Sequence, residues 1–267
     1  MRESYIGIAD FTDFQQVQQM LEVFTAFRPA GSKRMLHVGA MMSQKTLNDL
    51  PTVWANAFPP KENIAHIFGS DGAYNCLHYV DYYHSPDFRR DLTNAISFCG
   101  ARIDALQLDM IWPSPVQVAE GVIASRKRID VILQIGRKAL EIAGNDPKAV
   151  VARLADYEGV IQRVLLDKRI GRGLGMNARV LLPFVRAIKE AYPTLGVGVA
   201  AGLGPKTMRL AEPLIGEFPD LSFDAQANLY RDGSALKPID LNLAEAYLVK
   251  ALALVHQLQP QPQMAEA

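Results

Sequence analysis

The sequence predicts an α/β fold, specifically a single closed (β/α)8 barrel. Short runs rich in valine, isoleucine and leucine recur eight times along the chain, and amphipathic stretches separate them. Nearly every run ends in a polar residue or in glycine, as strands do where they open onto a loop. Eight strands that alternate with helices favour parallel pairing around a closed barrel. The expected strands cover residues 5–9, 35–40, 76–81, 103–109, 129–135, 161–167, 195–201 and 221–225.

The stretches between the strands have helical spacing. Asp13 is placed to cap the first helix, in which Phe14, Val17 and Leu21 line one face. The alternative fold is an open doubly wound sheet, which usually has fewer strands and a glycine-rich turn after the first one. The turn over residues 9–13 contains no glycine, so the barrel is favoured. Further helices are expected over residues 87–99, 116–124, 147–156, 178–191, 205–216 and 240–257.

The barrel is expected to occupy residues 1–257 as one domain. Residues 43–75 are too long for one plain helix and contain several prolines and glycines, which indicates an insertion between the second and third strands. Insertions of this kind often shape a pocket or a contact between subunits, which leaves a homodimer open. Residues 258–267 lack apolar periodicity, and we expect them to form a disordered tail.

The composition is that of an ordinary globular protein, with 49% hydrophobic and 21% charged residues. Basic and acidic residues number 28 each, so no overall charge attracts the chain to nucleic acid or to an anionic membrane. The two cysteines are too few for a disulfide scaffold and indicate a reducing compartment. The sequence contains no signal-peptide pattern and no apolar run of the roughly 20 residues that span a bilayer. A cytoplasmic protein without nucleic-acid or membrane partners is therefore expected.

The reacting groups of such a barrel lie at the carboxyl ends of its strands and in the loops that follow. Side chains alternate faces along a strand, so Gln107 and Asp109 share one face. A single carboxylate at a strand end is about as often a helix cap as a catalytic group, so the prediction rests on the set as a whole. The catalytic candidates are Asp167, Asp10 and Asp109, and the substrate-binding candidates are Gln107, His37, Gln134, Arg172 and Gly173.

Two glycine-containing loops indicate how an anion would bind. Gly202, Leu203 and Gly204 follow the seventh strand, and Pro205 suits the first turn of a helix whose bare N–H groups favour phosphate. The alternative is that the two glycines serve only a tight turn. Residues 171–175 contain three glycines and an arginine, which would close over a ligand and hold its anionic group. The alternative for this second loop is a mobile connector.

Other kinds of site find little support in the sequence. The five histidines are scattered, without an HExxH motif or paired cysteines, so we expect no metal and no cofactor. No G-x-S-x-G turn presents a nucleophilic serine. Lys168 lies on the opposite strand face from Asp167, which argues against Schiff-base chemistry. His78, Asp81 and His84 would cluster only if a strand end bent, which keeps a divalent-metal lyase as a third hypothesis.

The strand motifs resemble those of phosphoribosylanthranilate isomerase, a ribulose-phosphate-binding TIM barrel of tryptophan biosynthesis. That family begins with the strand K-I-C-G-I-T, which residues 5–9 resemble. Its fourth strand, A-V-Q-L-H-G, is similar to residues 105–110, and its sixth ends in L-L-D, as residues 165–167 do. Its later motifs A-G-G-L and D-V-S-S-G resemble residues 201–203 and 224–228. The resemblance implies Asp167 as the acid of an isomerisation, with Gln226 and Ala227 at the positions of two phosphate-binding serines.

The chain departs from that family at groups that the isomerisation needs. Ile6 stands at the position of the cysteine base, and the loop G-S-G-K-T becomes residues 173–177, without the lysine. Because loss of a general base usually lowers the rate by about 10²–10⁴-fold, another group must replace it. Asp10 is expected on the same strand face as Ile6, four residues further on. Either Asp10 or Asp109 would then be the base.

We therefore expect a divergent, isomerase-like enzyme that carries out an isomerisation or related enolisation on a small phosphorylated, sugar-like metabolite. Backbone N–H groups of Gly202, Leu203 and Gly204 would hold the phosphate with help from Arg172. The alternative is a non-catalytic barrel that has lost its base and binds a metabolite or a partner protein. In that case the insertion and the tyrosines near the third strand would matter more than Asp167.

Overall fold

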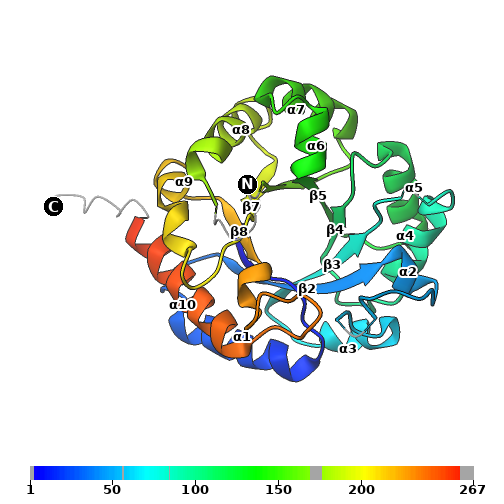
Figure 1. Ribbon diagram of the computed structural model, residues 1–267, viewed down its shortest axis with the longest axis horizontal. Helices are drawn as coiled ribbons and strands as arrows, with labels where there is room; N and C mark the ends of the chain where they lie inside the picture. The colour runs from blue at the N-terminus through cyan, green and yellow to red at the C-terminus, as the bar shows by residue number, and fades with distance from the viewer. Residues whose placement is uncertain (1–2, 56, 84, 169–175, 259–267) are drawn as a thin grey trace.

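The computed structural model describes residues 3–55, 57–83, 85–168 and 176–258, and it confirms the closed barrel. Eight parallel strands pair in chain order, and β8 closes the ring by pairing with β1 (Figure 1). The strands are β1 (Tyr5–Ile8), β2 (Met35–Ser43), β3 (Ala73–Val80), β4 (Ala105–Asp109), β5 (Asp130–Gly136), β6 (Arg163–Asp167), β7 (Gly196–Val199) and β8 (Ser222–Ala225).

Helices surround the ring of strands, and the last helix, α10, packs beside α1 (Figure 1). The α-helices are α1 (Phe14–Phe27), α2 (Gln44–Leu47), α3 (Ile64–Ile67), α4 (Phe88–Ser97), α5 (Pro115–Ser125), α6 (Arg137–Ile142), α7 (Pro147–Leu154), α8 (Ala178–Ala191), α9 (Glu212–Glu217) and α10 (Leu241–Leu258). The 3-10 helices are η1 (Lys61–Asn63), η2 (Ala155–Tyr157), η3 (Met208–Ala211) and η4 (Ala227–Leu229). No helix in these described ranges combines the length and the apolar character that a membrane crossing needs.

The ends of the elements show which sequence signals were informative. Asp13 caps α1 as predicted, because its side chain accepts a 2.9 Å hydrogen bond from the Gln16 N–H. The insertion is shorter than the predicted 43–75, because β2 continues to Ser43 and β3 begins at Ala73. It contains α2, η1 and α3. The short helix α6 directly after β5 was not predicted.

The helix predicted over residues 205–216 is wrong as one continuous element. The chain after β7 makes a turn, then η3, and α9 begins only at Glu212. Pro213 explains the break, since proline lacks an N–H and is best accommodated in the first turn of a helix. Pro205 therefore precedes the helical residues and does not occupy a first turn.

Alternation along the strands divides the apolar residues into two clusters. Side chains such as Ile6, Val38 and Leu166 belong to the large cluster that contains residues of the surrounding helices. Tyr5, Cys76, Ala105, Ile132 and Leu165 form a smaller cluster inside the barrel. Each strand thus carries one set of side chains to the helices and the alternate set to the barrel axis.

Arg163 closes the amino-terminal end of the barrel. Its Nε lies 3.6 Å from Asp130 Oδ2 and donates to the Tyr74 hydroxyl at 3.3 Å, while Nη2 donates to the Glu3 carbonyl at 2.7 Å. The guanidinium also lies over the ring of Tyr5. A paired cation and aromatic rings thus fill the amino-terminal end of the barrel. The polar side chains at the carboxyl ends of the strands lie at the opposite end, which is open.

Candidate active site

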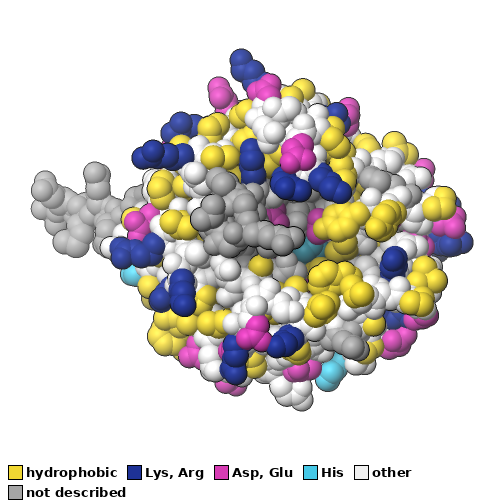
Figure 2. All heavy atoms as spheres, in the orientation of Figure 1, with side chains coloured by type: hydrophobic (Ala, Val, Ile, Leu, Met, Phe, Trp, Pro, Cys, Tyr) yellow, Lys and Arg dark blue, Asp and Glu magenta, His cyan; other side chains and the backbone are white. Residues whose placement is uncertain are grey.

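The carboxyl ends of the strands open onto two neighbouring cavities at the mouth of the barrel. A cavity of about 720 Å³ lies between β1, β3 and the insertion, and apolar side chains make up much of its wall, among them Met41, Val53, Trp54 and Phe58. A cavity of about 640 Å³ lies over β4 to β6 and includes Arg137 and Lys138. Figure 2 shows hydrophobic side chains beside the centre of the barrel and basic side chains near β5 and α6.

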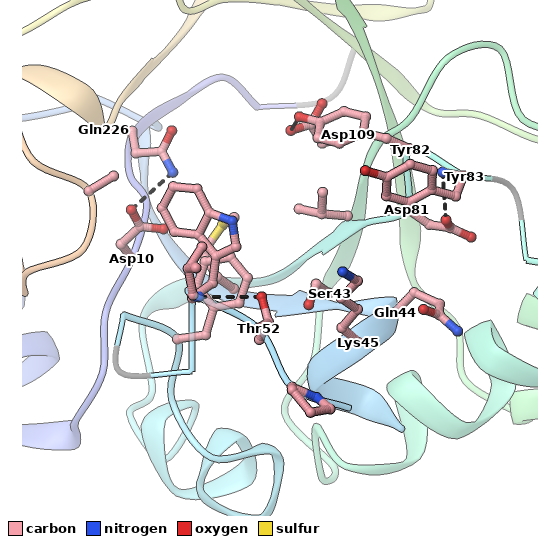
Figure 3. Close-up of a pocket in the computed structure, with 17 residues that line it drawn as sticks. Asp10, Ser43, Gln44, Lys45, Thr52, Asp81, Tyr82, Tyr83, Asp109 and Gln226 are labelled. Carbon is pink, nitrogen blue, oxygen red and sulfur yellow. Dashed lines mark hydrogen bonds between the residues drawn. The ribbon is translucent and has the colours of Figure 1, made fainter. Parts of the chain in front are cut away.

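Three side chains line both cavities and separate them: Tyr82, Asp109 and Gln226. Tyr82 follows β3 and donates a 2.6 Å hydrogen bond from its hydroxyl to Asp109 Oδ2 at the end of β4. Figure 3 shows this pair across the larger cavity from Asp10 and Gln226. A ligand in the mouth would therefore lie between carboxylates that come from opposite sides of the barrel.

Asp10, the residue two positions after β1, is one of two buried carboxylates that line the larger cavity, and Asp81 is the other. Asp10 has a left-handed backbone with φ of 71°, which turns its side chain toward the mouth. Its Oδ2 accepts hydrogen bonds from Gln226 Nε2 at 2.9 Å and from the Tyr230 hydroxyl. Burial raises the pKa of Asp10 to about 6, although the Gln226 hydrogen bond and the His78 charge lower it. A carboxyl with this pKa exchanges protons near neutral pH.

Asp224 on β8 is a second buried carboxyl. Burial raises its pKa to about 7, the charges of Asp10 and Asp167 add to that rise, and His78 opposes it. Its Oδ1 is buried and has no hydrogen-bond partner among the described residues. Asp224 and Asp167 both line a small cavity of about 20 Å³ below the mouth. The charge of Asp167 in this shared space is one cause of the raised pKa of Asp224.

The predicted side chains of β4, β5 and β6 form a continuous chain of contacts. Gln107 Nε2 donates to Gln134 Oε1 at 2.8 Å, and Gln134 Nε2 donates to Asp167 Oδ2 at 3.4 Å. Gln107 and Gln134 are buried, whereas Asp167 is partly exposed at the end of its strand. The predicted parity is confirmed here, since Leu165 packs inside the barrel and Leu166 packs against the helices.

His78 on β3 lies on the barrel axis beside these groups. Its Nε2 is 3.8 Å from Asp109 Oδ2, and the Gln107 amide nitrogen lies 3.4 Å from the same ring atom. Burial disfavours the charged imidazole, but Asp109, Asp10 and Asp224 outweigh it and raise the pKa of His78 above its ordinary value. Sequence analysis noted His78 as a strand-end residue and as a member of a possible metal cluster with Asp81 and His84, and His84 lies outside the described residues. The part of the chain that the structure describes contains no group of three metal-binding side chains.

Two sequence-based placements are corrected by the structure. Ile6 and Asp10 do not share a face, because Ile6 packs outward in the large cluster and the positive φ of Asp10 turns the chain. His37 lies deeper than a substrate-binding position, stacked on Tyr5 with ring centroids 4.6 Å apart. It is 1% exposed, and burial lowers its pKa to about 3, so it is neutral at ordinary pH.

The glycine loop after β7 lies beside the small cavity below the mouth, which we call the floor cavity. Gly202 has a positive φ of 75° and lines the small cavity, and its carbonyl accepts hydrogen bonds from Thr207 and Asn228. Leu203 is fully buried, so its backbone alone is a candidate for ligand contact. A Cβ on Gly204 would lie 2.5 Å from the Asn228 Cβ, which explains why glycine is required there. Gln226 reaches the mouth, and Ala227 begins η4.

Some predicted residues have no place in this description, and some functional residues were not predicted. Arg172 and Gly173 lie outside the described residues, as do residues 259–267 of the predicted tail. Asp224 was noted with Gln226 as a strand-end residue but was not selected as a catalytic or binding residue, although its position two residues before Gln226 would have placed both on one strand face. Tyr230 and Trp54 had no distinguishing signal, because each contributes through a loop whose path depends on the folded barrel.

The fold has many known counterparts, and the chain is a TIM barrel. Among solved structures, it is similar to the tryptophan synthase alpha chain from Legionella pneumophila subsp. pneumophila, with a TM-score of 0.58 and 12% identity over 97% of this chain and 94% of that chain. A phosphonopyruvate hydrolase matches with a TM-score of 0.54 and 13% identity over 84% of this chain and 75% of that chain.

The chain is also similar to active domain 2 of a thermostable chitinase from Pyrococcus furiosus, solved as catalytic site mutants complexed with chito-oligosaccharides. This match has a TM-score of 0.59 and 11% identity over 98% of each chain. No protein-family model matches the sequence, and no curated protein does. At these identities the likeness establishes the barrel fold alone. The resemblance to phosphoribosylanthranilate isomerase remains a prediction from sequence motifs.

Proposed function

We propose that this barrel is an enzyme that moves a proton on a small phosphorylated, sugar-like metabolite, as in an isomerisation through an enediol. The observation that supports this most directly is the pair of buried carboxyls, Asp10 and Asp224, whose pKa values burial raises to about 6 and 7. Groups that titrate near neutral pH at the catalytic end of a barrel are suited to general acid–base work. A carboxyl with an ordinary role in capping or pairing would titrate several pH units lower.

Asp10 is the proposed base. At neutral pH it is mostly ionised, yet its pKa is high enough to accept a proton, and it faces the larger cavity. The proposed acid is Asp167, which faces the smaller cavity and shares the floor with Asp224. In this proposal the two carboxyls share one proton, and because the pKa of Asp224 is about 7, that proton is available for transfer near neutral pH.

The proposed step conserves atoms and charge. Asp10 accepts the proton from the carbon next to a carbonyl group, and the Asp167–Asp224 pair donates its proton to the carbonyl oxygen. The other hydroxyl group of the enediol, on the carbon that lost its proton, then gives its proton to this pair, and the former carbonyl carbon receives the proton from Asp10. Both carboxyl groups recover their starting charge, and the carbonyl group has moved by one carbon.

The phosphate would lie at the loop of Gly202, Leu203 and Gly204, close to Gln226 and Ala227. This placement is supported by the position of Gly202 beside the floor cavity and by the frequent use of this part of TIM barrels for phosphate. The remainder of the ligand would occupy the larger cavity, whose apolar wall suits the carbon face of a sugar-like molecule.

A thermal-shift screen against inorganic phosphate, ribose and ribulose phosphates and carboxylated analogues tests the substrate class. A ligand at about 100 times its dissociation constant should stabilise the fold by about 2.7 kcal/mol. Gly202→Asp should abolish the thermal shift by placing a negative charge at the loop. Gly202→Asn places an uncharged side chain of similar shape at the same positive-φ position and should retain the thermal shift.

A bound phosphosugar should then be converted by the wild-type protein, and Asp167→Asn should abolish the conversion while leaving the thermal shift intact. Full activity of Asp167→Asn would contradict its role. Binding without any product would favour the alternative of a non-catalytic barrel, and the absence of a shift with every phosphate ester would contradict the proposed substrate class.

A further inference from the structure

His78 has no role in the proton transfer proposed above, yet its surroundings are unusual for a buried histidine. It is 5% exposed and projects from β3 toward the barrel axis. The floor cavity is lined by His78 together with Gln107, Gln134, Asp167 and Asp224. An imidazole in the middle of a carboxyl cluster is the group best placed to balance its negative charge.

The charged groups that face His78 come from several strands. Asp109 on β4 is the nearest, with Oδ2 3.8 Å from Nε2. Asp224 on β8 and Asp167 on β6 line the floor cavity with His78, and so does Gln226, whose amide donates a hydrogen bond to Asp10 after β1. The charges of Asp10 and Asp224 both favour the imidazolium form. His37 on β2 also faces it but is neutral, because burial lowers its pKa to about 3. Lys45 and Asp81 lie further out in the wall of the larger cavity.

Tyr82, at the rim of the mouth, fixes Asp109 through the same oxygen that faces His78. The Tyr82 hydroxyl donates to Oδ2 of this carboxylate at 2.6 Å, so the oxygen that faces the imidazole is also the one that the rim tyrosine holds (Figure 3). The Gln107 amide in turn packs against the ring and is held by Gln134. The position of His78 is thus determined from β4 and β5 as well as from its own strand.

We propose that His78 is a positioning residue of this site, whose imidazolium, held by Asp109, stabilises the carboxylate form of Asp10. The inference rests on the proposed role of Asp10 as the base. Without the cation, a larger fraction of the buried Asp10 would retain its proton at neutral pH, and that fraction could not accept a proton from a substrate. His78 acts through Asp10 and need not touch the ligand. The same charge limits how firmly Asp224 retains its proton.

The direct test is a carbon-13 NMR titration of the full chain with labelled aspartate carboxyl groups, in which Asp10→Asn assigns the Asp10 signal. Wild-type Asp10 should titrate near pH 6. His78→Gln should raise this midpoint by about one pH unit or more, the usual effect of removing a neighbouring opposite charge. His37→Gln is the matched control, because it removes a buried but neutral imidazole from the next strand, and the midpoint should stay unchanged.

An unchanged Asp10 midpoint in folded His78→Gln would overturn the proposal. Should His78→Gln fail to fold, nitrogen-15 signals of the His78 ring decide the question in wild type and in Asp10→Asn. Linkage between two sites is reciprocal, so loss of the Asp10 charge must lower the His78 midpoint by the same amount. A ring that is neutral at pH 6 in wild type, or insensitive to Asp10→Asn, would also overturn it. No ligand is needed, so this result is independent of whether the proposed substrate class is correct.

Discussion

The Gln226 amide donates a 2.9 Å hydrogen bond to Asp10 Oδ2, although the two residues are 216 positions apart in the chain. The contact joins the loop after β8 to the loop after β1, where closure of the barrel makes the first and last strands neighbours. The Tyr230 hydroxyl donates to the same oxygen. These two donors hold one carboxylate oxygen and leave Oδ1, which has no partner among the described residues, as the atom available for proton transfer.

Asp10→Asn should lower turnover of an identified substrate by about 10²–10⁴-fold, because the amide cannot accept a proton. Asparagine tolerates the left-handed backbone of this residue, so folding and phosphosugar affinity should be retained. Asp10→Ala should lower the melting temperature further, because alanine is strained at φ of 71° and loses the bonds to Gln226 and Tyr230. Steady-state kinetics and thermal unfolding distinguish the two effects. Wild-type turnover in Asp10→Asn would rule out Asp10 as the base.

The free energy of unfolding should depend on pH through Asp10 and Asp224. Both have folded-state pKa values above the ordinary 3.8, at about 6 for Asp10 and about 7 for Asp224. Between pH 3.8 and these values, the native state therefore binds more protons than the unfolded chain. The two carboxyls contribute their full stabilisation to the free energy of unfolding below about pH 4, and this stabilisation is lost as the pH rises through 6 and 7. For Asp224 alone the shift from 3.8 to about 7 corresponds to about 4 kcal/mol.

Asp224→Asn should therefore flatten the fall in stability between pH 4 and 8, as measured by urea unfolding at a series of pH values. Asp71→Asn is a suitable control, because the Asp71 side chain is 89% exposed and its removal should leave the slope unchanged. A slope in Asp224→Asn equal to that of wild type would show that this carboxyl is ionised at an ordinary pH.

Gly7→Ala should destabilise the barrel by about 1–3 kcal/mol. A Cβ at Gly7 on β1 would lie 2.6 Å from Asp224 Oδ1 and 2.9 Å from His37 Nδ1, so both buried side chains would have to move. Gly136→Ala on β5 is the matched control, since a Cβ there meets no atom within 4 Å. Chemical denaturation of the two variants measures the difference. Equal stability would contradict the close approach of His37 and Asp224 over Gly7.

Trp54→Ala should weaken ligand binding by about 2–10-fold and change the melting temperature of the free protein little. The indole stacks on Phe58 with ring centroids 5.9 Å apart, and it is 38% exposed at the wall of the larger cavity. An aromatic contact of this kind contributes about 0.5–1.5 kcal/mol. Calorimetric titration with a phosphosugar found by thermal shift measures the effect. Val116→Ala, at a side chain on α5 that is 63% exposed, should leave the affinity unchanged.

The strand-end side chains show how far local pattern reached into the site. Gln107, Gln134 and Asp167 were predicted from their positions at strand ends, and they lie in one hydrogen-bonded chain. His37 was selected by the same rule but lies a layer deeper, because a strand pattern gives the face of a residue and not its height along the barrel axis. The extent of β2, which continues to Ser43, decided that height.

The sequence by itself determined the architecture. Apolar periodicity places eight strands and their helices, and alternation within each strand separates the residues that face the helices from those that face the axis. Both signals are local, and a barrel built from adjacent βα units needs little else.

The tertiary structure alone decided the chemistry of the mouth. The pairing of Gln226 and Tyr230 with Asp10, the position of His78 among four carboxyl groups and the raised pKa values of Asp10 and Asp224 all depend on burial and on contacts between distant segments. A pKa reflects how much water surrounds a group and which charges lie near it. Neither quantity exists until the ring of strands has closed.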